Sequence, residues 1–161
     1  MIRVFLITGS NRGDRMALLE QAAARIHKKT GKIKRTSSVY ETESWGFSDP
    51  VFFLNQVLEV NSELKPPEIL TSIRQIEDEL GRTRMEHGYS PRTMDIDILL
   101  YGAQVINFPG LKIPHPLMPE RRFVLVPLAE IAGGLIHPVL KVPIAELLDQ
   151  CKDPCKVKKC H

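Results

Sequence analysis

The sequence predicts an α+β fold, in which helices pack on an antiparallel sheet, because two kinds of apolar pattern alternate along the chain. Short runs rich in β-branched residues are typical of strands, and longer stretches with apolar residues every three or four positions are typical of helices. Of the 161 residues, 43% are hydrophobic and 25% charged, which suits a single globular domain with an ordinary core.

Three strands and one helix are predicted in the first sixty residues. Residues 2–8 (IRVFLIT) predict a buried strand, and residues 15–29, with apolar side chains at helical spacing, predict a helix that Asp14 caps. Two further strands are expected at 34–43 and 51–60, joined by a loop over 44–50.

A second helix and a fourth long strand complete the pattern. Pro66 and Pro67 suit the first turn of a helix, and Gly81 suits its end. A polar loop over 82–93 then leads into a strand at 94–101. The resulting βαββαβ order is that of the ferredoxin-like plan, an antiparallel sheet with both helices on one face. Weaker patterns predict further helices at 118–132 and 143–150.

The positive charge of the chain comes from its C-terminal end. The formal net charge is +3, and residues 151–161 hold four lysines and one aspartate, so the rest of the chain is balanced. A balanced body argues against nucleic acid as a partner, because nucleic-acid binding requires a basic face. No apolar run is long enough for a membrane span and the N-terminus lacks a signal-peptide pattern, so we expect a cytoplasmic protein without a membrane partner.

The three cysteines, Cys151, Cys155 and Cys160, all lie in this C-terminal segment, so no disulfide framework staples the body. Their spacing could ligate a soft metal but fits no common zinc pattern. We therefore expect one domain over residues 1–150, followed by a disordered basic tail over 151–161.

Asp95 and Asp97 interrupt an otherwise apolar strand, PRTMDIDILLYG. Side chains alternate along a strand, so the two carboxylates share one face, roughly 7 Å apart at ~3.3 Å per residue. Such a pair can hold one or two hard cations, and Mg²⁺ usually arrives with substrate phosphates. The alternative is a pair of solvent-facing aspartates that keep an edge strand from aggregating.

The loop before this strand supplies Arg82, Arg84 and Arg92. Carboxylates that bind metal beside a cluster of guanidinium groups suit a polyphosphate, although a solvated loop with surface ion pairs is the alternative. The glycine-containing turn TGSNRGD is neither a P-loop nor a G-x-G-x-x-G fingerprint, so a protein that binds ATP here does so without either common phosphate cradle.

Five separate segments carry a resemblance to a known family, and they span residues 1 to about 140 in the order and spacing of that family. They are GSNRGDR, SSVYETESWG before FLNQV, IEDELGRTR, PRTMDIDILLYG and IPHPLMPERRFVLVPLAEIAG. In these segments the chain resembles 6-hydroxymethyl-7,8-dihydropterin pyrophosphokinase, also called 2-amino-4-hydroxy-6-hydroxymethyldihydropteridine diphosphokinase.

The resemblance implies an enzyme of folate biosynthesis that transfers pyrophosphate from MgATP to the hydroxymethyl group of the pterin and releases AMP. It implies that Asp95 and Asp97 hold two Mg²⁺ ions, and that Arg82 and Arg92 are catalytic, neutralising charge that develops during transfer. Binding of ATP is expected from Arg84, Tyr89, Ile98, His115 and Arg121.

The pterin site can be carried over in the same way. Phe53 and Phe123 match the two aromatic positions that sandwich the flat ring, although either could simply be a core phenylalanine. Asn55 offers an amide donor and acceptor to the edge of the ring, and Thr42 and Trp45 belong to a segment expected to add contacts. We expect a monomer that acts on these two small molecules.

The chain departs from the family pattern at Tyr89, Ser90 and Pro116, which bears on adenine binding and on the loop expected to close over ATP. A non-catalytic small-molecule-binding domain on the same plan is the first rival function. It would not require Asp95, Asp97 and the two catalytic arginines together. A nucleic-acid-binding domain is the second rival, and the balanced charge opposes it.

Overall fold

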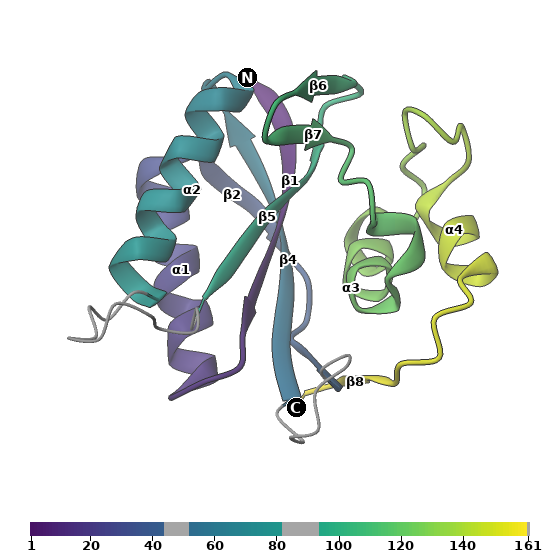
Figure 1. Ribbon diagram of the computed structural model, residues 1–161, viewed down its shortest axis with the longest axis horizontal. Coiled ribbons are helices and arrows are strands. Elements are labelled where there is room, and N and C mark those ends of the chain that lie inside the picture. Colours follow the sequence, from purple (N-terminus) through teal and green to yellow (C-terminus); the bar gives the residue numbers. More distant parts are fainter. Residues whose placement is uncertain (44–51, 82–93, 161) are drawn as a thin grey trace.

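The computed structural model describes residues 1–43, 52–81 and 94–160 of the chain. In this part of the chain an antiparallel sheet has helices on both faces, as Figure 1 shows. The strand order is β5-β1-β4-β3-β8, and β2 also pairs with β4. The strands are β1 (Ile2–Ser10), β2 (Lys32–Thr36), β3 (Tyr40–Glu43), β4 (Phe52–Ser62), β5 (Asp95–Tyr101) and β8 (Val157–Lys159).

The first face of the sheet is covered by α1 (Arg15–Lys29) and α2 (Pro66–Gly81). Apolar residues at alternate positions of the central strands, including Leu6 and Ile98, pack with both helices in one buried cluster. The Asp14 carboxylate accepts a hydrogen bond from Ala17 N at 3.1 Å, as expected for an N-cap. The predicted α+β class and ferredoxin-like arrangement are thus confirmed.

The opposite face is covered by α3 (Arg122–Ala132) and α4 (Ile144–Gln150), which follow a short 3₁₀ helix, η1 (Met118–Glu120). The intervening side chains of the same strands, such as Phe5 and Ile7, pack with these helices in a second buried cluster. A small hairpin of β6 (Ile106–Phe108) and β7 (Leu111–Ile113) connects β5 to this layer. The sheet is therefore buried on both sides.

The predicted strand at 34–43 is two strands, β2 and β3, both paired with β4. The chain bends between them at Ser37, whose backbone N donates to Val57 O at 2.8 Å. The Ser37 hydroxyl in turn accepts from Val57 N at 2.9 Å. A side-chain oxygen thus replaces one backbone partner in the ladder, and this substitution divides the strand.

The C-terminal segment is ordered, contrary to the expected disordered tail. Its strand β8 pairs with β3, and Cys160 N donates to Val39 O at 2.9 Å. Three residues carry too little pattern to predict a strand that pairs with a partner more than one hundred residues away. The loops predicted at 44–50 and 82–93 lie outside the described residues. Within the described ranges, no helix is both long enough and apolar enough to cross a bilayer.

His137 lies in the turn between α3 and α4 and is only 4% exposed. Its Nδ1 atom accepts hydrogen bonds from Val139 N at 3.2 Å and Leu140 N at 3.1 Å. The neutral ring therefore carries its proton on Nε2. Burial lowers the pKa of His137, since protonation would charge a desolvated ring and remove the acceptor that holds the turn.

The free energy of unfolding should fall as the pH drops from 7.5 to 5.5. Below about pH 6.5 the unfolded chain binds a proton at position 137 that the folded chain does not, with a limiting slope of about 1.4 kcal/mol per pH unit. His137→Asn keeps an acceptor oxygen without titrating, so urea unfolding at both pH values should show a smaller loss. Lys28→Asn, at an exposed position of α1 that carries no imidazole, is the control and should keep the wild-type loss; equal losses in all three proteins would contradict this account.

Candidate active site

One row of paired residues crosses the sheet near the end of β1. Gly9 of β1 pairs with Asp95 of β5 on one side and with Asn55 of β4 on the other, and Asn55 pairs with Tyr40 of β3. Directly paired residues of antiparallel strands point to the same face. Asp95, Asn55 and Tyr40 therefore share the face that α3 and α4 cover, and Asp97, paired with Ile7, joins them.

Buried polar atoms around this row have no hydrogen-bond partner among the described residues. The Asn55 side chain is 6% exposed; its Nδ2 donates to Thr8 O at 3.3 Å, whereas its Oδ1 has no such partner. The same holds for Thr42 Oγ1, which is on the same face because Thr42 pairs with Phe53. An unpaired buried polar atom costs free energy, so these two oxygens on one face indicate a site that a polar ligand completes.

Gly9 allows the Asn55 side chain to lie across the row. A Cβ atom at position 9 would come within 2.5 Å of Asn55 Nδ2, closer than real Cβ contacts. Only glycine therefore permits this orientation of the amide. Thr42 and Phe53 are direct partners on the neighbouring strands β3 and β4, so they extend the same surface.

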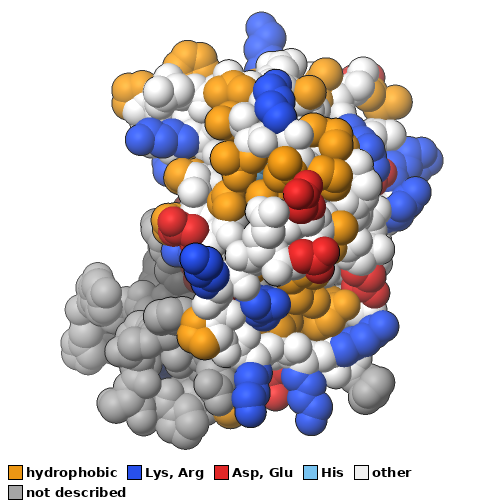
Figure 2. All heavy atoms as spheres, turned by 90° about the vertical axis from the view of Figure 1, so that its right-hand side faces the viewer, with side chains coloured by type: hydrophobic (Ala, Val, Ile, Leu, Met, Phe, Trp, Pro, Cys, Tyr) orange, Lys and Arg blue, Asp and Glu red, His pale blue; other side chains and the backbone are white. Residues whose placement is uncertain are grey.

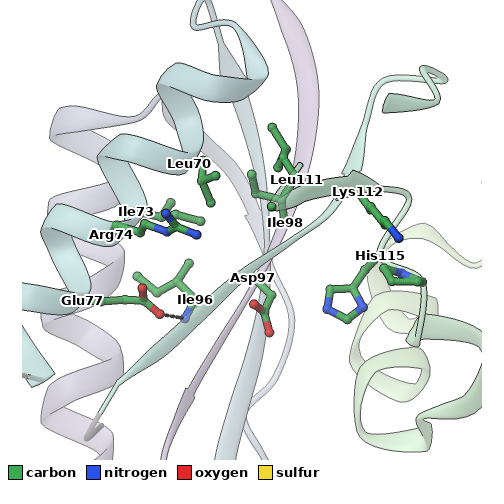
Figure 3. Close-up of a pocket in the computed structure, with 12 residues that line it drawn as sticks. Leu70, Ile73, Arg74, Glu77, Ile96, Asp97, Ile98, Leu111, Lys112 and His115 are labelled. Atoms are coloured by element: carbon green, nitrogen blue, oxygen red, sulfur yellow. Dashed lines mark hydrogen bonds between the residues drawn. The ribbon is translucent and has the colours of Figure 1, made fainter. Parts of the chain in front are cut away.

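A second feature is a pocket of about 350 Å³ along the open edge of β5, shown in Figure 3. Helix α2 forms one wall and the segment 110–116 forms the other. The lining combines apolar, acidic and cationic side chains, which suits a ligand with a flat apolar part and anionic groups. The principal lining residues are Leu70, Ile73, Arg74, Glu77, Asp97, Ile98, Leu111, Lys112 and His115.

The edge of β5 is held at two points. Glu77 of α2 accepts a hydrogen bond from Ile96 N at 2.9 Å, the dashed line in Figure 3. Further along, β1 pairs with Ile98 and then with Leu100, which leaves Leu99 as an extra residue in the ladder. The Leu99 carbonyl accepts from His115 N at 3.0 Å, and this bond brings His115 to the pocket.

His115 and Asp97 lie on neighbouring sides of the pocket in Figure 3. The His115 Nδ1 atom accepts from Leu117 N at 3.2 Å, so the neutral ring carries its proton on Nε2 and can donate it to an anion. Burial lowers the pKa of His115, the Asp97 charge opposes this, and the Arg121 charge adds to it. The Arg121 guanidinium also lies 5.6 Å from the centre of the Phe123 ring.

Most of the predicted site residues in the described ranges fall into these two features. Asp97, Ile98 and His115 line the pocket, while Asn55 and Asp95 belong to the row across the sheet. Thr42 and Phe53 extend that row, and Phe123 and Arg121 stack at the start of α3. The remaining predictions, Trp45, Arg82, Arg84, Tyr89 and Arg92, lie outside the described residues.

Sequence reasoning missed three polar residues of the site, Arg74, Glu77 and Lys112. Arg74 and Glu77 are one helical turn apart on α2, a spacing that could have marked them as a polar pair on an otherwise apolar face. Lys112 alternates with buried Leu111 and Ile113 on a three-residue strand, too short a pattern to notice.

Asp95 and Asp97 fit a divalent cation by their chemistry. Two carboxylates on one face offer the hard oxygen ligands that Mg²⁺ prefers. Among the described residues no group of three or more His, Cys, Asp and Glu side chains could hold a metal by itself. This donor set suits an ion whose other ligands are waters and substrate phosphates. Fold and site together are those of a small-molecule-binding enzyme with room for a phosphorylated ligand and carboxylates for its cation.

Comparison with known proteins gives the family. The family model described as 7,8-dihydro-6-hydroxymethylpterin-pyrophosphokinase (HPPK) matches residues 5–133. The 2-amino-4-hydroxy-6-hydroxymethyldihydropteridine pyrophosphokinase of Aquifex aeolicus is 40% identical over 146 residues, covering 91% of this chain and 90% of its own. That of Porphyromonas gingivalis is 44% identical, covering 89% and 99%. The chain belongs to the 7,8-dihydro-6-hydroxymethylpterin-pyrophosphokinase family.

A solved structure shows the same fold in a longer protein. Plasmodium falciparum HPPK-DHPS superposes with a TM-score of 0.75 at 18% identity, covering 92% of this chain and 44% of that chain. This chain therefore spans less than half of that protein. The predicted family and the prediction of an ATP-dependent pyrophosphokinase are confirmed.

Gly9→Ala should weaken pterin binding, because the new Cβ displaces the Asn55 amide. The loss of its aligned hydrogen bonds should raise the KM for pterin about 10- to 100-fold. Steady-state kinetics with each substrate varied would measure this, and the KM for ATP should change little. Gly134→Ala is the control, since a Cβ there meets nothing within 4 Å; an unchanged pterin KM in Gly9→Ala would contradict the role of Asn55.

Proposed function

We propose that Asp95 and Asp97 join two adjoining substrate sites of this pyrophosphokinase, with ATP at the β5 edge and the pterin over the row through Asn55. As a member of its family, the chain transfers pyrophosphate from ATP to hydroxymethyldihydropterin in folate biosynthesis. The observation that carries the site assignment is the pairing of Gly9 with both Asp95 and Asn55. This pairing sets the carboxylates beside the oxygens of Asn55 and Thr42 that have no partner among the described residues.

The pocket at β5 supplies what ATP requires. Leu70, Ile73 and Leu111 offer apolar surface for the adenine ring. Because Ile96 N points out of the open edge to Glu77, strand alternation turns Ile98 N the same way, where it can donate to the base. Arg74, Lys112, His115 and Arg121 offer cationic or N–H donors for the phosphates.

The pterin forms hydrogen bonds with buried oxygen atoms that have no partner in the described part of the chain. The Oδ1 of Asn55 and the Oγ1 of Thr42 accept hydrogen bonds from the ring edge, and they are the atoms that a polar heterocycle would satisfy. Phe53 and Phe123 hold the ring faces by stacking. Trp45 completes this site by resemblance to the family.

Two Mg²⁺ ions held by Asp95 and Asp97 would neutralise phosphate charge and polarise the transferred group. The chain itself positions the reactants. The row across the sheet places the pterin hydroxymethyl group on the side of the carboxylates, so that its oxygen can attack the β-phosphorus of ATP while AMP leaves. By resemblance, Arg82 and Arg92 neutralise the charge that develops, and Arg84 and Tyr89 contact ATP.

We further propose that the enzyme works as a cytoplasmic monomer on these small molecules, without nucleic acid. On the face drawn in Figure 2, lysine and arginine side chains are interspersed with acidic and apolar ones, which does not favour a polyanion.

The reaction class is tested by measuring AMP release. The protein is incubated with MgATP, with and without 6-hydroxymethyl-7,8-dihydropterin, and the products are separated by chromatography. AMP should form only with pterin present, and EDTA should abolish it, because the carboxylates alone cannot neutralise the phosphates. Binding of both ligands without AMP would instead support a non-catalytic binding domain.

Asp97→Asn should lower kcat by about 100-fold or more, because it removes one charge from the cation site without changing side-chain volume. The thermal midpoint should change little, since Asp97 is exposed. The matched control is Asp149→Asn, which changes an exposed aspartate of α4 that does not line the pocket at β5 and should keep wild-type turnover. Near-normal turnover in Asp97→Asn would exclude Asp97 as a metal ligand.

A further inference from the structure

We infer that the C-terminal segment, residues 151–160, is a positioning element of the pterin site: it holds β3 and the start of α3 in place for pterin binding, and none of its residues lines the pocket at β5. This inference rests on the proposed pterin site. The segment lies beyond residue 133, where the family match ends.

The first support is the pairing of β8 with β3. Val157 of β8 pairs with Thr42 of β3, and Thr42 pairs on its other side with Phe53 of β4. Strand β8 is therefore the edge strand next to two residues expected to bind the pterin. Strand β3 has only four residues and would otherwise have an open edge in the described sheet. A short edge strand is weakly held, and pairing on its second side restricts its movement.

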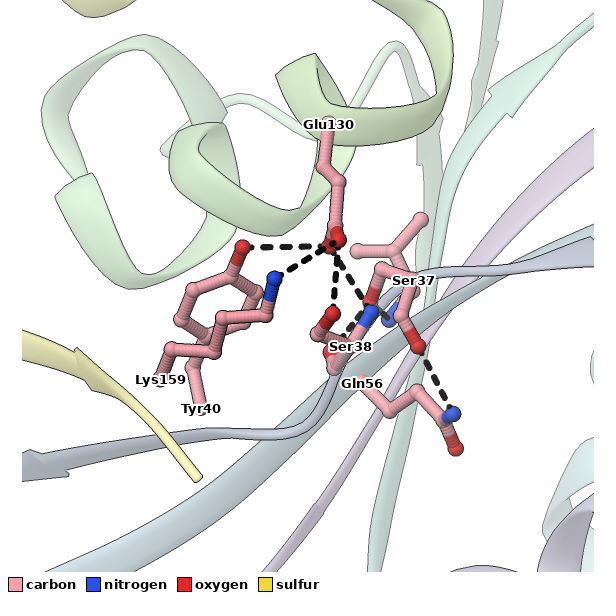
Figure 4. Close-up of polar contacts among 7 residues, drawn as sticks. Ser37, Ser38, Tyr40, Gln56, Glu130 and Lys159 are labelled. Atoms are coloured by element: carbon pink, nitrogen blue, oxygen red, sulfur yellow. Dashed lines mark hydrogen bonds and ion pairs between the residues drawn. The ribbon is translucent and has the colours of Figure 1, made fainter. Parts of the chain in front are cut away.

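The second support is the polar cluster at Glu130 of α3, drawn in Figure 4. Its carboxylate accepts from Ser38 N at 2.7 Å, Ser38 Oγ at 2.6 Å and Tyr40 Oη at 3.1 Å. Lys159 of β8 places its Nζ 3.8 Å away. Desolvation would raise the pKa of Glu130, but the Ser38 and Tyr40 hydrogen bonds and the Lys159 charge lower it. The ionised carboxylate thus ties β3 and β8 to α3.

The third support is the attachment of the segment to Arg122, the residue before Phe123. Arg122 N donates to Asp153 Oδ2 at 3.0 Å. Its guanidinium donates to Asp153 O at 3.0 Å and to Cys151 O at 2.8 Å. Asp153 is 8% exposed, and its Oδ1 accepts from Cys155 N at 2.9 Å. The Asp153 carboxylate therefore bonds within the segment, to Cys155 N, and attaches the segment to the first turn of α3, which carries Phe123.

The segment consequently touches both walls of the proposed pterin site. It reaches Thr42 through β8 and Phe123 through Arg122, while none of its residues lines the pocket at β5. Loosening it should disturb the relative placement of the two walls and spare the ATP pocket. A segment that merely covered an edge strand would affect stability alone.

Asp153→Ala tests this, because it removes the two hydrogen bonds that the Asp153 carboxylate accepts, from Arg122 N and from Cys155 N. In the full-length chain the KM for pterin should rise about tenfold, with the KM for ATP and kcat at saturating substrates within about twofold of wild type. The matched control, Asp149→Ala, alters an exposed aspartate four residues earlier and should leave both KM values unchanged. Circular dichroism and thermal melting establish that each variant is folded.

A folded Asp153→Ala variant with an unchanged pterin KM would overturn the inference, as would equal increases for both substrates. Should that variant not fold, hydrogen exchange of the wild-type chain decides. Pterin should slow exchange in β3 and in residues 157–160 together, and ATP alone should not; protection of β3 without the segment would overturn the inference. A wild-type chain that forms no pterin-dependent AMP would instead overturn the proposed function, and this inference with it.

Discussion

Both proposed substrate sites depend on the antiparallel pairing of β1 with its two neighbours, β4 and β5. This pairing brings Asn55, Gly9 and Asp95 into one row, although each is at least forty residues from the next in sequence. Gly9 lacks a side chain, so the Asn55 amide can lie across it, and a carboxylate stands on the far side. A slip of one residue in either pairing would turn these side chains to the other face, against α1 and α2.

The strands β5 and β3 differ in whether their outer edge is covered, and this difference matches the two roles proposed for them. At β5 the edge is open, and its backbone, Asp97 and His115 form a pocket that α2 closes from one side. At β3 the edge is covered by β8, which Arg122 and Glu130 hold against α3. An open edge offers backbone donors to a ligand, whereas a covered edge gives a rigid support for the adjacent side chains.

Some polar groups of this fold have hydrogen-bond partners among the described residues, and others have none. Glu130 and Asp153 accept several hydrogen bonds each, so they join elements and stabilise the fold. Asn55 Oδ1 and Thr42 Oγ1 have no such partner in the described part of the chain, and they face the proposed pterin site. A ligand that supplies the missing partners at the proposed site would offset the free-energy cost of burying these two oxygens.

The sequence by itself determined the long elements and the family, because periodicity and the residue types of the motifs can be read directly along the chain. It therefore predicted α1 to the residue, the ferredoxin-like order and the shared face of Asp95 and Asp97. The tertiary structure decided which distant residues meet: the division of β2 from β3 at Ser37, the approach of His115 to the pocket, and the pairing of β8 with β3. Each of these depends on one or two non-local hydrogen bonds or on a three-residue strand, and such contacts leave no periodic pattern in the chain.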